Sequence, residues 1–172
     1  MKIGEIINFL ETSAPLSLQE SYDNAGLIYG SPDWECTGAL VSLDLTEAVL
    51  DEAIRLGFNL IVSHHPLVFG AMKKFNLSKP VPRMLARAIK NDIAVYAIHT
   101  NLDNISGGVN QEIAVRLGLR DQEILLPKGN LLRKLYVYVP QEHLETLQSA
   151  IFEAGAGHIG NYSECSFHVP GT

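Results

Sequence analysis

Three short apolar runs, each followed by a helical pattern, constrain the fold of this chain more than any other feature. The apolar runs occupy residues 38–44, 59–63 and 93–98. Helical spacing of apolar residues follows over 46–57, 81–91 and 109–117. Short apolar runs are typical of buried strands, so the pattern predicts three successive β-α units and an α/β fold. We expect a mostly parallel sheet that is covered by helices on both faces.

Two further segments precede these units. The apolar residues of segment 3–10 recur at helical spacing, which predicts an N-terminal amphipathic helix that ends before Pro15. Residues 21–27 contain Asp23, Asn24 and Gly26, which suit an Asx-type loop. We therefore expect a helix and then a turn before the first β-α unit.

The pattern changes after residues 119–130, which predicts two domains, 1–130 and 131–172. In the second domain, residues 135–139 alternate between apolar and tyrosine side chains as in a half-buried strand, and a helix follows from Leu144. This pair is the start of an α+β module. Because a β-α pair cannot bury a core alone, it must dock on the first domain, pair with another chain or continue into further sequence.

Composition limits the class of protein. The chain has 172 residues, of which 47% are hydrophobic and 19% charged, as in soluble globular proteins. Neither a signal-peptide pattern nor an apolar run of membrane-spanning length occurs, so we expect a cytoplasmic protein without membrane contact. Cys36 and Cys165 lie far apart in the sequence, which argues against a disulfide framework or a cysteine-rich zinc finger.

Candidate metal ligands follow two of the predicted strands. His64 and His65 end the run 59–63, and Asp103 follows the run 93–98. In open α/β sheets, ligands bind outside the carboxyl ends of the strands, and imidazole and carboxylate are standard ligands of first-row metals. The alternative is that these histidines are structural, as a lone histidine at a strand end usually is.

The spacing of the candidate ligands also indicates how they are distributed between metal ions. Neighbouring side chains in an extended chain point to opposite faces, so His64 and His65 are poorly arranged to hold one ion together. One histidine per metal, with Asp103 nearby or bridging, predicts a two-metal site with ions about 3.5–4 Å apart. A kink at Pro66 would change this expectation.

Charge is unevenly distributed. The net charge of −6 gives no indication of specific nucleic-acid binding. Yet no acidic residue lies between Glu52 and Asp92, and the basic residues of this span are concentrated over 73–90. This segment could attract a nucleotide or another phosphate-bearing substrate. Alternatively, Arg83 and its helical neighbours form only the solvated face of a helix.

Four motifs give the chain a family resemblance. In order, they are Tyr22-Asp-Asn-Ala-Gly-Leu27, Val41-Ser-Leu-Asp-Leu45, Ser63-His-His-Pro-Leu67 and His99-Thr-Asn-Leu-Asp103. Their order and intervals resemble the GTP cyclohydrolase I type 2 homologue family, also called the Nif-three-like proteins. The resemblance covers about residues 1–130, whereas 131–172 look like the opening of the PII-like or CutA-like insert of some members.

The resemblance implies a dinuclear site for divalent ions such as zinc, iron or manganese, two per subunit, in a toroidal homohexamer. His64 and His65 match the paired histidine ligands of the family, one per metal, and Asp103 matches its aspartate ligand. The family adds a histidine and a bridging glutamate from a C-terminal half that lies beyond these 172 residues. The sequence is therefore expected to be the N-terminal part of a longer protein.

The family name implies hydrolytic opening of the GTP imidazole ring to formate and a dihydropterin triphosphate. His99 is then a candidate general acid or base, or a structural residue that orients the Asp103 loop. Asp23 and Asn24 are either partners of the histidine ligands or only a turn. A rival from another class stays open, namely a metal-dependent regulatory or scaffold protein, or a phosphoesterase, with a ligand-sensing insert.

Overall fold

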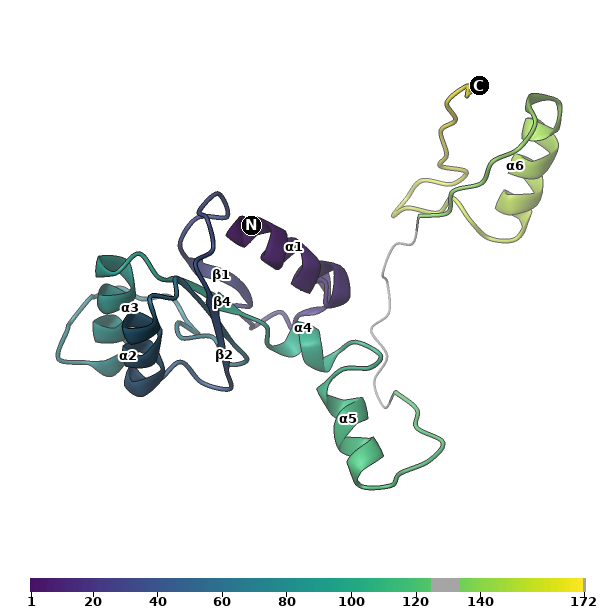
Figure 1. Ribbon diagram of the computed structural model, residues 1–172. Coiled ribbons are helices and arrows are strands. Elements are labelled where there is room, and N and C mark those ends of the chain that lie inside the picture. Colours follow the sequence, from purple (N-terminus) through teal and green to yellow (C-terminus); the bar gives the residue numbers. More distant parts are fainter. Residues whose placement is uncertain (125–133, 172) are drawn as a thin grey trace. The chain divides into compact units, whose positions relative to one another are not determined.

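The computed structural model describes residues 1–124 and 134–171, which divide into two units, Met1–Gln122 and Glu123–Thr172 (Figure 1). The boundary predicted between residues 130 and 131 lies outside the described residues.

A four-stranded mixed sheet forms the centre of the first unit. Its strands are β1 (Gly26–Tyr29), β2 (Ala39–Ser42), β3 (Leu60–Ser63) and β4 (Ala94–Ala97), in the spatial order β1-β4-β3-β2. Strands β2, β3 and β4 are parallel, which confirms the mostly parallel sheet, and β1 pairs with β4 in the antiparallel direction. The sequence did not predict β1, because its four residues follow turn-forming residues directly.

Helices join and cover the strands. In chain order they are α1 (Ile3–Ser13), the 3₁₀ helix η1 (Leu16–Leu18), α2 (Glu47–Leu56), α3 (Pro80–Lys90), α4 (Thr100–Asp103) and α5 (Val109–Arg116). Helix α2 begins where the Thr46 hydroxyl accepts a hydrogen bond from the Val49 N–H, and it ends at Gly57 in the left-handed conformation. The short helix α4 was not predicted.

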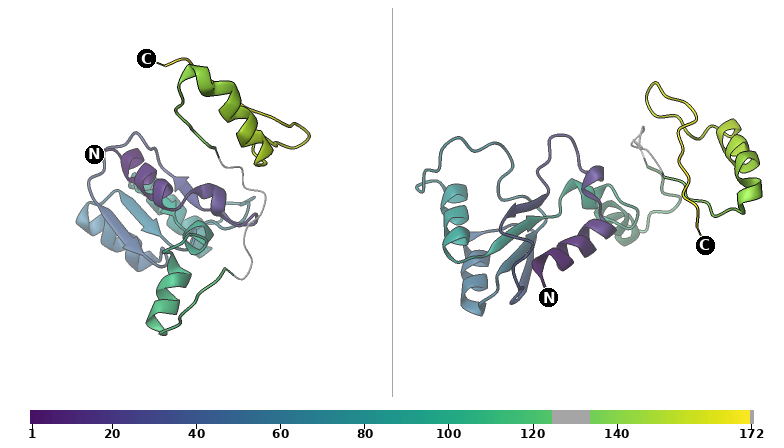
Figure 2. Two further views of the ribbon diagram at one scale, coloured as in Figure 1. Left: turned by 90° about the vertical axis from the view of Figure 1, so that its right-hand side faces the viewer. Right: turned by 90° about the horizontal axis from the view of Figure 1, so that it is seen from above.

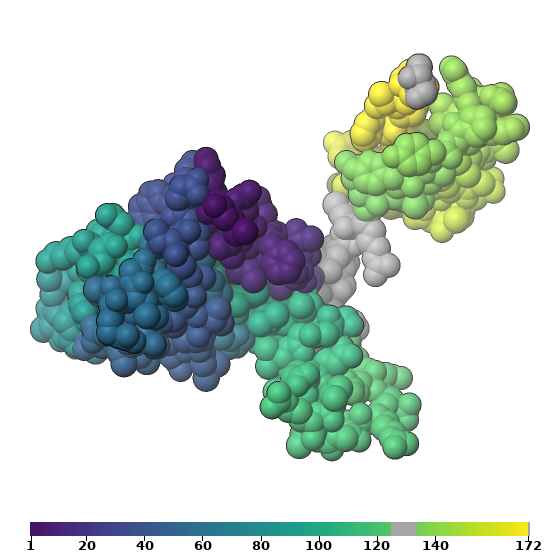
Figure 3. Space-filling model, in the orientation of Figure 1, coloured from purple at the N-terminus to yellow at the C-terminus, as the bar shows by residue number. Residues whose placement is uncertain are grey.

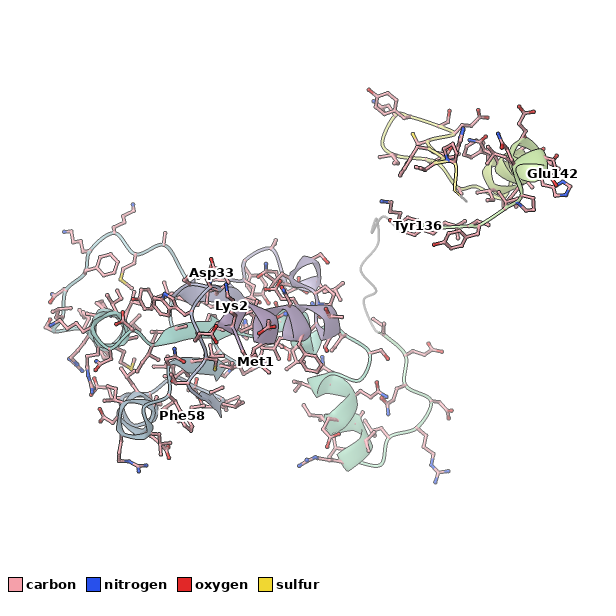
Figure 4. All side chains as sticks on the ribbon, turned by 45° about the horizontal axis from the view of Figure 1, so that its top comes forward. Met1, Lys2, Asp33, Phe58, Tyr136 and Glu142 are labelled. Carbon is pink, nitrogen blue, oxygen red and sulfur yellow. The ribbon has the colours of Figure 1, made fainter. Side chains whose placement is uncertain are left out.

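The sheet separates two apolar layers, and Figure 2 shows helices on both of its faces. Alternate residues of β3 and β4 face opposite layers. Ile61 and Val95 pack with α2 and α3, whereas Leu60 and Tyr96 pack with α1. The start of α1 is also tied to the loop between β1 and β2 by an ion pair between Lys2 and Asp33 (3.3 Å; Figure 4). The predicted covering of both faces is confirmed.

The second unit contains α6 (Leu144–Glu153), which confirms the predicted helix that includes Leu144, Leu147 and Ile151. The 3₁₀ helix η2 (Gln141–His143) precedes it. The predicted strand over 135–139 is wrong, because these residues form no strand, and the side chains of Tyr136 and Tyr138 are 69% and 99% exposed (Figure 4). A strand needs a hydrogen-bonded neighbour, and the described part of this unit offers none.

Helix α5 differs from the other α-helices of the first unit, because none of its residues is buried. Figure 3 shows it as a protrusion of that unit.

Over residues 1–124 and 134–171, no helix combines the length and the apolar character needed to cross a membrane.

Candidate metal centre

The predicted histidine ligands lie just beyond β3, where the backbone hydrogen bonds between the strands end. The backbone N–H groups of His64 and His65 donate to the carbonyl oxygens of Ser42 (3.1 Å) and Leu43 (3.0 Å), so β2 fixes the chain beyond the end of β3. On the other side, Ile98 N–H donates to the Ser63 carbonyl (2.9 Å), which fixes the chain that leads to His99. The residues that follow the three adjacent parallel strands β2, β3 and β4 therefore lie at one edge of the sheet.

A cluster of three imidazoles lies at this edge. One ring nitrogen each of His64, His65 and His99 lies within 4.8 Å of the other two, and the ring centroids are 4.9 to 5.5 Å apart. His64 and His99 are partly buried and His65 is exposed. We call these residues the histidine cluster. His99, predicted as an acid-base or structural residue, thus lies beside both predicted histidine ligands.

The expectation that His64 and His65 point to opposite faces is wrong, because their ring centroids are only 4.9 Å apart. Strand β3 ends at Ser63, and the Ser63 hydroxyl donates to the His65 carbonyl oxygen (2.8 Å), which bends the chain before Pro66. The alternation of side chains requires an extended chain, and here the chain is bent. The two rings can therefore contribute to the same site.

Each ring of the histidine cluster is held through its Nδ1 atom. The acceptors are the Ile98 carbonyl for His64 (2.9 Å), an Asp44 carboxylate oxygen for His65 (2.8 Å) and an Asp23 carboxylate oxygen for His99 (2.9 Å). A carbonyl or ionised carboxylate can only accept, so Nδ1 carries the proton and Nε2 of each neutral ring keeps its lone pair. Metal-binding histidines typically have this arrangement, and the donor set therefore fits a divalent cation.

The Asp103 carboxylate lies close to one member of the cluster. Asp103 ends α4, and its Oδ1 atom is 3.8 Å from Nε2 of His64. This distance is too long for a hydrogen bond. Two bonds of about 2.0–2.2 Å to a single ion can span it. The structure thus places Asp103 next to His64, outside the three-histidine cluster itself.

Asp23 connects His99 to the start of α4. Its side chain has no exposed surface, and it accepts hydrogen bonds from His99 Nδ1, from the Thr100 N–H (3.0 Å) and from the Thr100 hydroxyl. Burial alone would raise the pKa of Asp23. Hydrogen bonds from Thr100 and His99, and from the backbone of Asn24 and Thr100, outweigh burial and hold the pKa of this carboxyl below its ordinary value. Asp23 is therefore a carboxylate that orients His99.

The other turn residue, Asn24, contacts a loop instead of a histidine. Its Nδ2 atom donates to the Val68 carbonyl oxygen (2.6 Å). Asn24 therefore ties the 22–24 loop to the segment that follows the paired histidines.

Asp44 is a site residue that the sequence reasoning missed. The motif 41–45 contributed to the family resemblance but received no role. A signal was available, because Asp44 is the last residue of the predicted strand 38–44 and lies at the same edge of the sheet as the histidines. Through its bond to His65 it does for that ring what Asp23 does for His99.

The basic segment 73–90 is partly neutralised. Arg83 forms an ion pair with Glu47 of α2 (Nε to Oε1, 2.8 Å), and Arg87 forms one with Asp51. These two cations thus follow the alternative of a solvated helix face. Lys73 and Lys74 are exposed on the loop that follows the paired histidines, so they remain the better candidates for contact with an anionic substrate.

Comparison with known proteins gives consistent matches. The model of the Duf34/NIF3 (NGG1p interacting factor 3) family matches residues 1–168. The chain is 43% identical to a GTP cyclohydrolase 1 type 2 homolog of Halalkalibacterium halodurans, covering all of this chain and 47% of the relative. It is 42% identical to the protein of the same name from Bacillus subtilis, covering 97% of this chain and 45% of the relative.

Solved structures agree with these matches. A Bacillus cereus protein related to NIF3 is 41% identical with a TM-score of 0.71, covering 97% of this chain and 46% of that one. Reduced HcgD from Methanocaldococcus jannaschii is 34% identical with a TM-score of 0.68, covering 73% of this chain and 50% of that one. The chain thus spans about half the length of the relatives that it matches.

Proposed function

Because the chain belongs to the Duf34/NIF3 family, we propose that it binds divalent metal ions through His64, His65 and Asp103 and acts as a metal-dependent hydrolase. The observation that carries this proposal is the histidine cluster, in which three imidazoles lie together and each has its Nδ1 atom fixed. If the three histidines had only structural roles, nothing would require their ring nitrogens to lie within 4.8 Å of one another.

The chemistry divides between the ion and the protein. A divalent ion held by these residues would supply Lewis acidity and would lower the pKa of water to about 7. His99 is either a fourth ligand or the residue that accepts and returns a proton at its Nε2 atom. In both roles Asp23 keeps the Nδ1 proton in place, and Asp44 does the same for His65.

We propose GTP as the substrate class to test first, with hydrolytic opening of its imidazole ring to formate and a dihydropterin triphosphate. The names of the H. halodurans and B. subtilis relatives support this choice. The exposed Lys73 and Lys74 support binding of a triphosphate, because cations near a site raise the local concentration of anions.

The test is to load the purified full-length protein with zinc, manganese or iron, to add GTP and to measure formate and dihydropterin triphosphate. We expect both products in equal amounts, and we expect neither with the metal-free chain or with the His64→Ala variant. Absence of both products with all three metals would reject the cyclohydrolase proposal.

The same assay distinguishes the alternative functions. Release of inorganic phosphate without formate would favour a phosphoesterase. Metal binding without any turnover would favour a regulatory or scaffold role for the metal.

We also propose that the chain forms a homo-oligomer, specifically the toroidal hexamer implied by its resemblance, and that 131–172 begin a PII-like or CutA-like insert. Helix α5 supports self-association, because Ile113 and Val115 are 50% and 59% exposed, and such apolar surface commonly lies at interfaces. A cytoplasmic location stays a prediction from the sequence.

A further inference from the structure

Two exposed aromatic side chains border the histidine cluster. Tyr22 is 65% exposed and Phe69 is 50% exposed, and their ring centroids are 6.3 Å apart with an interplanar angle of 41°. The Phe69 ring also meets His99 edge to face, with centroids 6.0 Å apart and an angle of 85°. We call Tyr22 and Phe69 the aromatic shelf.

The aromatic shelf is tied to the site through both of the segments that carry it. Tyr22 directly precedes Asp23, which binds His99, and Phe69 directly follows Val68, whose carbonyl accepts the side-chain hydrogen bond of Asn24. The two rings therefore belong to segments held against each other at the rim of the histidine cluster.

The surface beside the shelf is concave. A cavity of about 220 Å³ is lined by Asn24 and Val68, the neighbours of the shelf, and by apolar side chains that include Met72 and Phe75. Ligand sites typically combine such a hollow with aromatic walls and a few polar groups. Asn24 supplies the polar side chain of this hollow, and neither the shelf rings nor the histidines are among its lining residues.

Exposed aromatic rings next to polar catalytic groups are suited to planar ligands. A heteroaromatic ring has a π-face that stacks on Tyr or Phe, and this interaction is worth about 1–3 kcal/mol per base in nucleic-acid-binding proteins. The exposed Lys73 and Lys74 follow Phe69 along the same loop and favour a ligand that also carries negative charge.

We propose that the aromatic shelf stacks a planar heteroaromatic ring of the substrate and holds it against the histidine cluster. This inference deepens the proposed function and rests on its site, because it assigns ring recognition to Tyr22 and Phe69 and leaves phosphate recognition to other residues. It concerns binding of the ring, whatever bond is then cleaved.

The test compares a ligand with the ring and one without it. Binding of GTP and of inorganic tripolyphosphate to the zinc-loaded full-length protein is measured by calorimetry. The parent chain should bind GTP more tightly than tripolyphosphate. Phe69→Leu should weaken GTP binding about tenfold, since tenfold corresponds to about 1.4 kcal/mol of lost stacking, and leave tripolyphosphate binding unchanged. Phe69→Trp should keep the affinity for GTP, because it restores an aromatic face.

The matched control is Phe9→Leu, which removes a 71% exposed phenylalanine from α1 and should leave both affinities unchanged. Three results would overturn the inference: equal binding of the two ligands by the parent, binding of neither, or GTP affinity that survives the double substitution Tyr22→Leu with Phe69→Leu. Ring-dependent binding without formate release would instead leave the shelf in place and reject only the cyclohydrolase proposal.

Discussion

Replacing His64 by alanine is expected to reduce the affinity of the chain for zinc more than about 100-fold. Loss of a residue that only orients a ligand typically costs 10–100-fold, and loss of a ligand should cost more. His64 is the central residue of the site, because it lies beside His65 and His99 and its Nε2 atom faces Asp103 at 3.8 Å. The measurement is zinc content per chain after gel filtration, together with a zinc titration by calorimetry.

The matched control for this prediction is His143→Ala. His143 is an exposed histidine of the second unit, outside the histidine cluster, and its removal should leave zinc content unchanged. Unchanged zinc content in His64→Ala, His65→Ala and Asp103→Ala alike would contradict the assignment of these residues as ligands.

The same titration separates the two roles of His99. If His99 is a ligand, His99→Ala should lower zinc content as His64→Ala does. If it transfers protons, His99→Ala should keep the zinc and lose formate release. The distinction matters because the histidine cluster joins His99 to both predicted ligands, whereas Asp103 is close to His64.

The sequence predicted those parts of the fold that depend on local pattern. The runs at 59–63 and 93–98 became β3 and β4 because continuous apolar stretches are stable only when both faces of the sheet are covered. Strand β1 escaped prediction because an antiparallel edge strand of four residues depends on a distant partner, here Ala94–Ala97. The strand expected at 135–139 failed for the complementary reason, since its alternating pattern has no partner among the described residues.

The candidate site likewise has features that the sequence pattern predicted and features that it did not. The strand-end position of His64 and His65 followed from β-α topology. Their relative orientation did not, because it depends on the bend made by the Ser63 hydroxyl. The carboxylates that hold the rings, Asp23 and Asp44, are 76 and 21 residues away from their histidines in the sequence, and only the folded sheet brings them together.

Replacing Asp23 by alanine is expected to lower the free energy of unfolding of the first unit by about 3 kcal/mol. The substitution leaves His99 Nδ1, the Thr100 N–H and the Thr100 hydroxyl without their acceptor, and each unsatisfied buried donor costs about 1–3 kcal/mol. We place the total near the low end of the sum, because water entering the vacated volume can replace some of these bonds. Urea denaturation followed by the fluorescence of Trp34, the single tryptophan, measures the change in this unit.

Asp33→Ala provides the matched control, because Asp33 is an 82% exposed aspartate whose ion pair with Lys2 should contribute at most about 1 kcal/mol. If His99 is a ligand, the Asp23→Ala variant should also bind zinc about 10–100-fold more weakly, since His99 is no longer held by its Nδ1 atom. A loss of stability no larger than that of Asp33→Ala would mean that Asp23 is not needed to hold the turn against α4. Full stability with weakened zinc binding would instead limit its role to orienting His99, so the two measurements together separate the structural from the metal-binding contribution of this carboxylate.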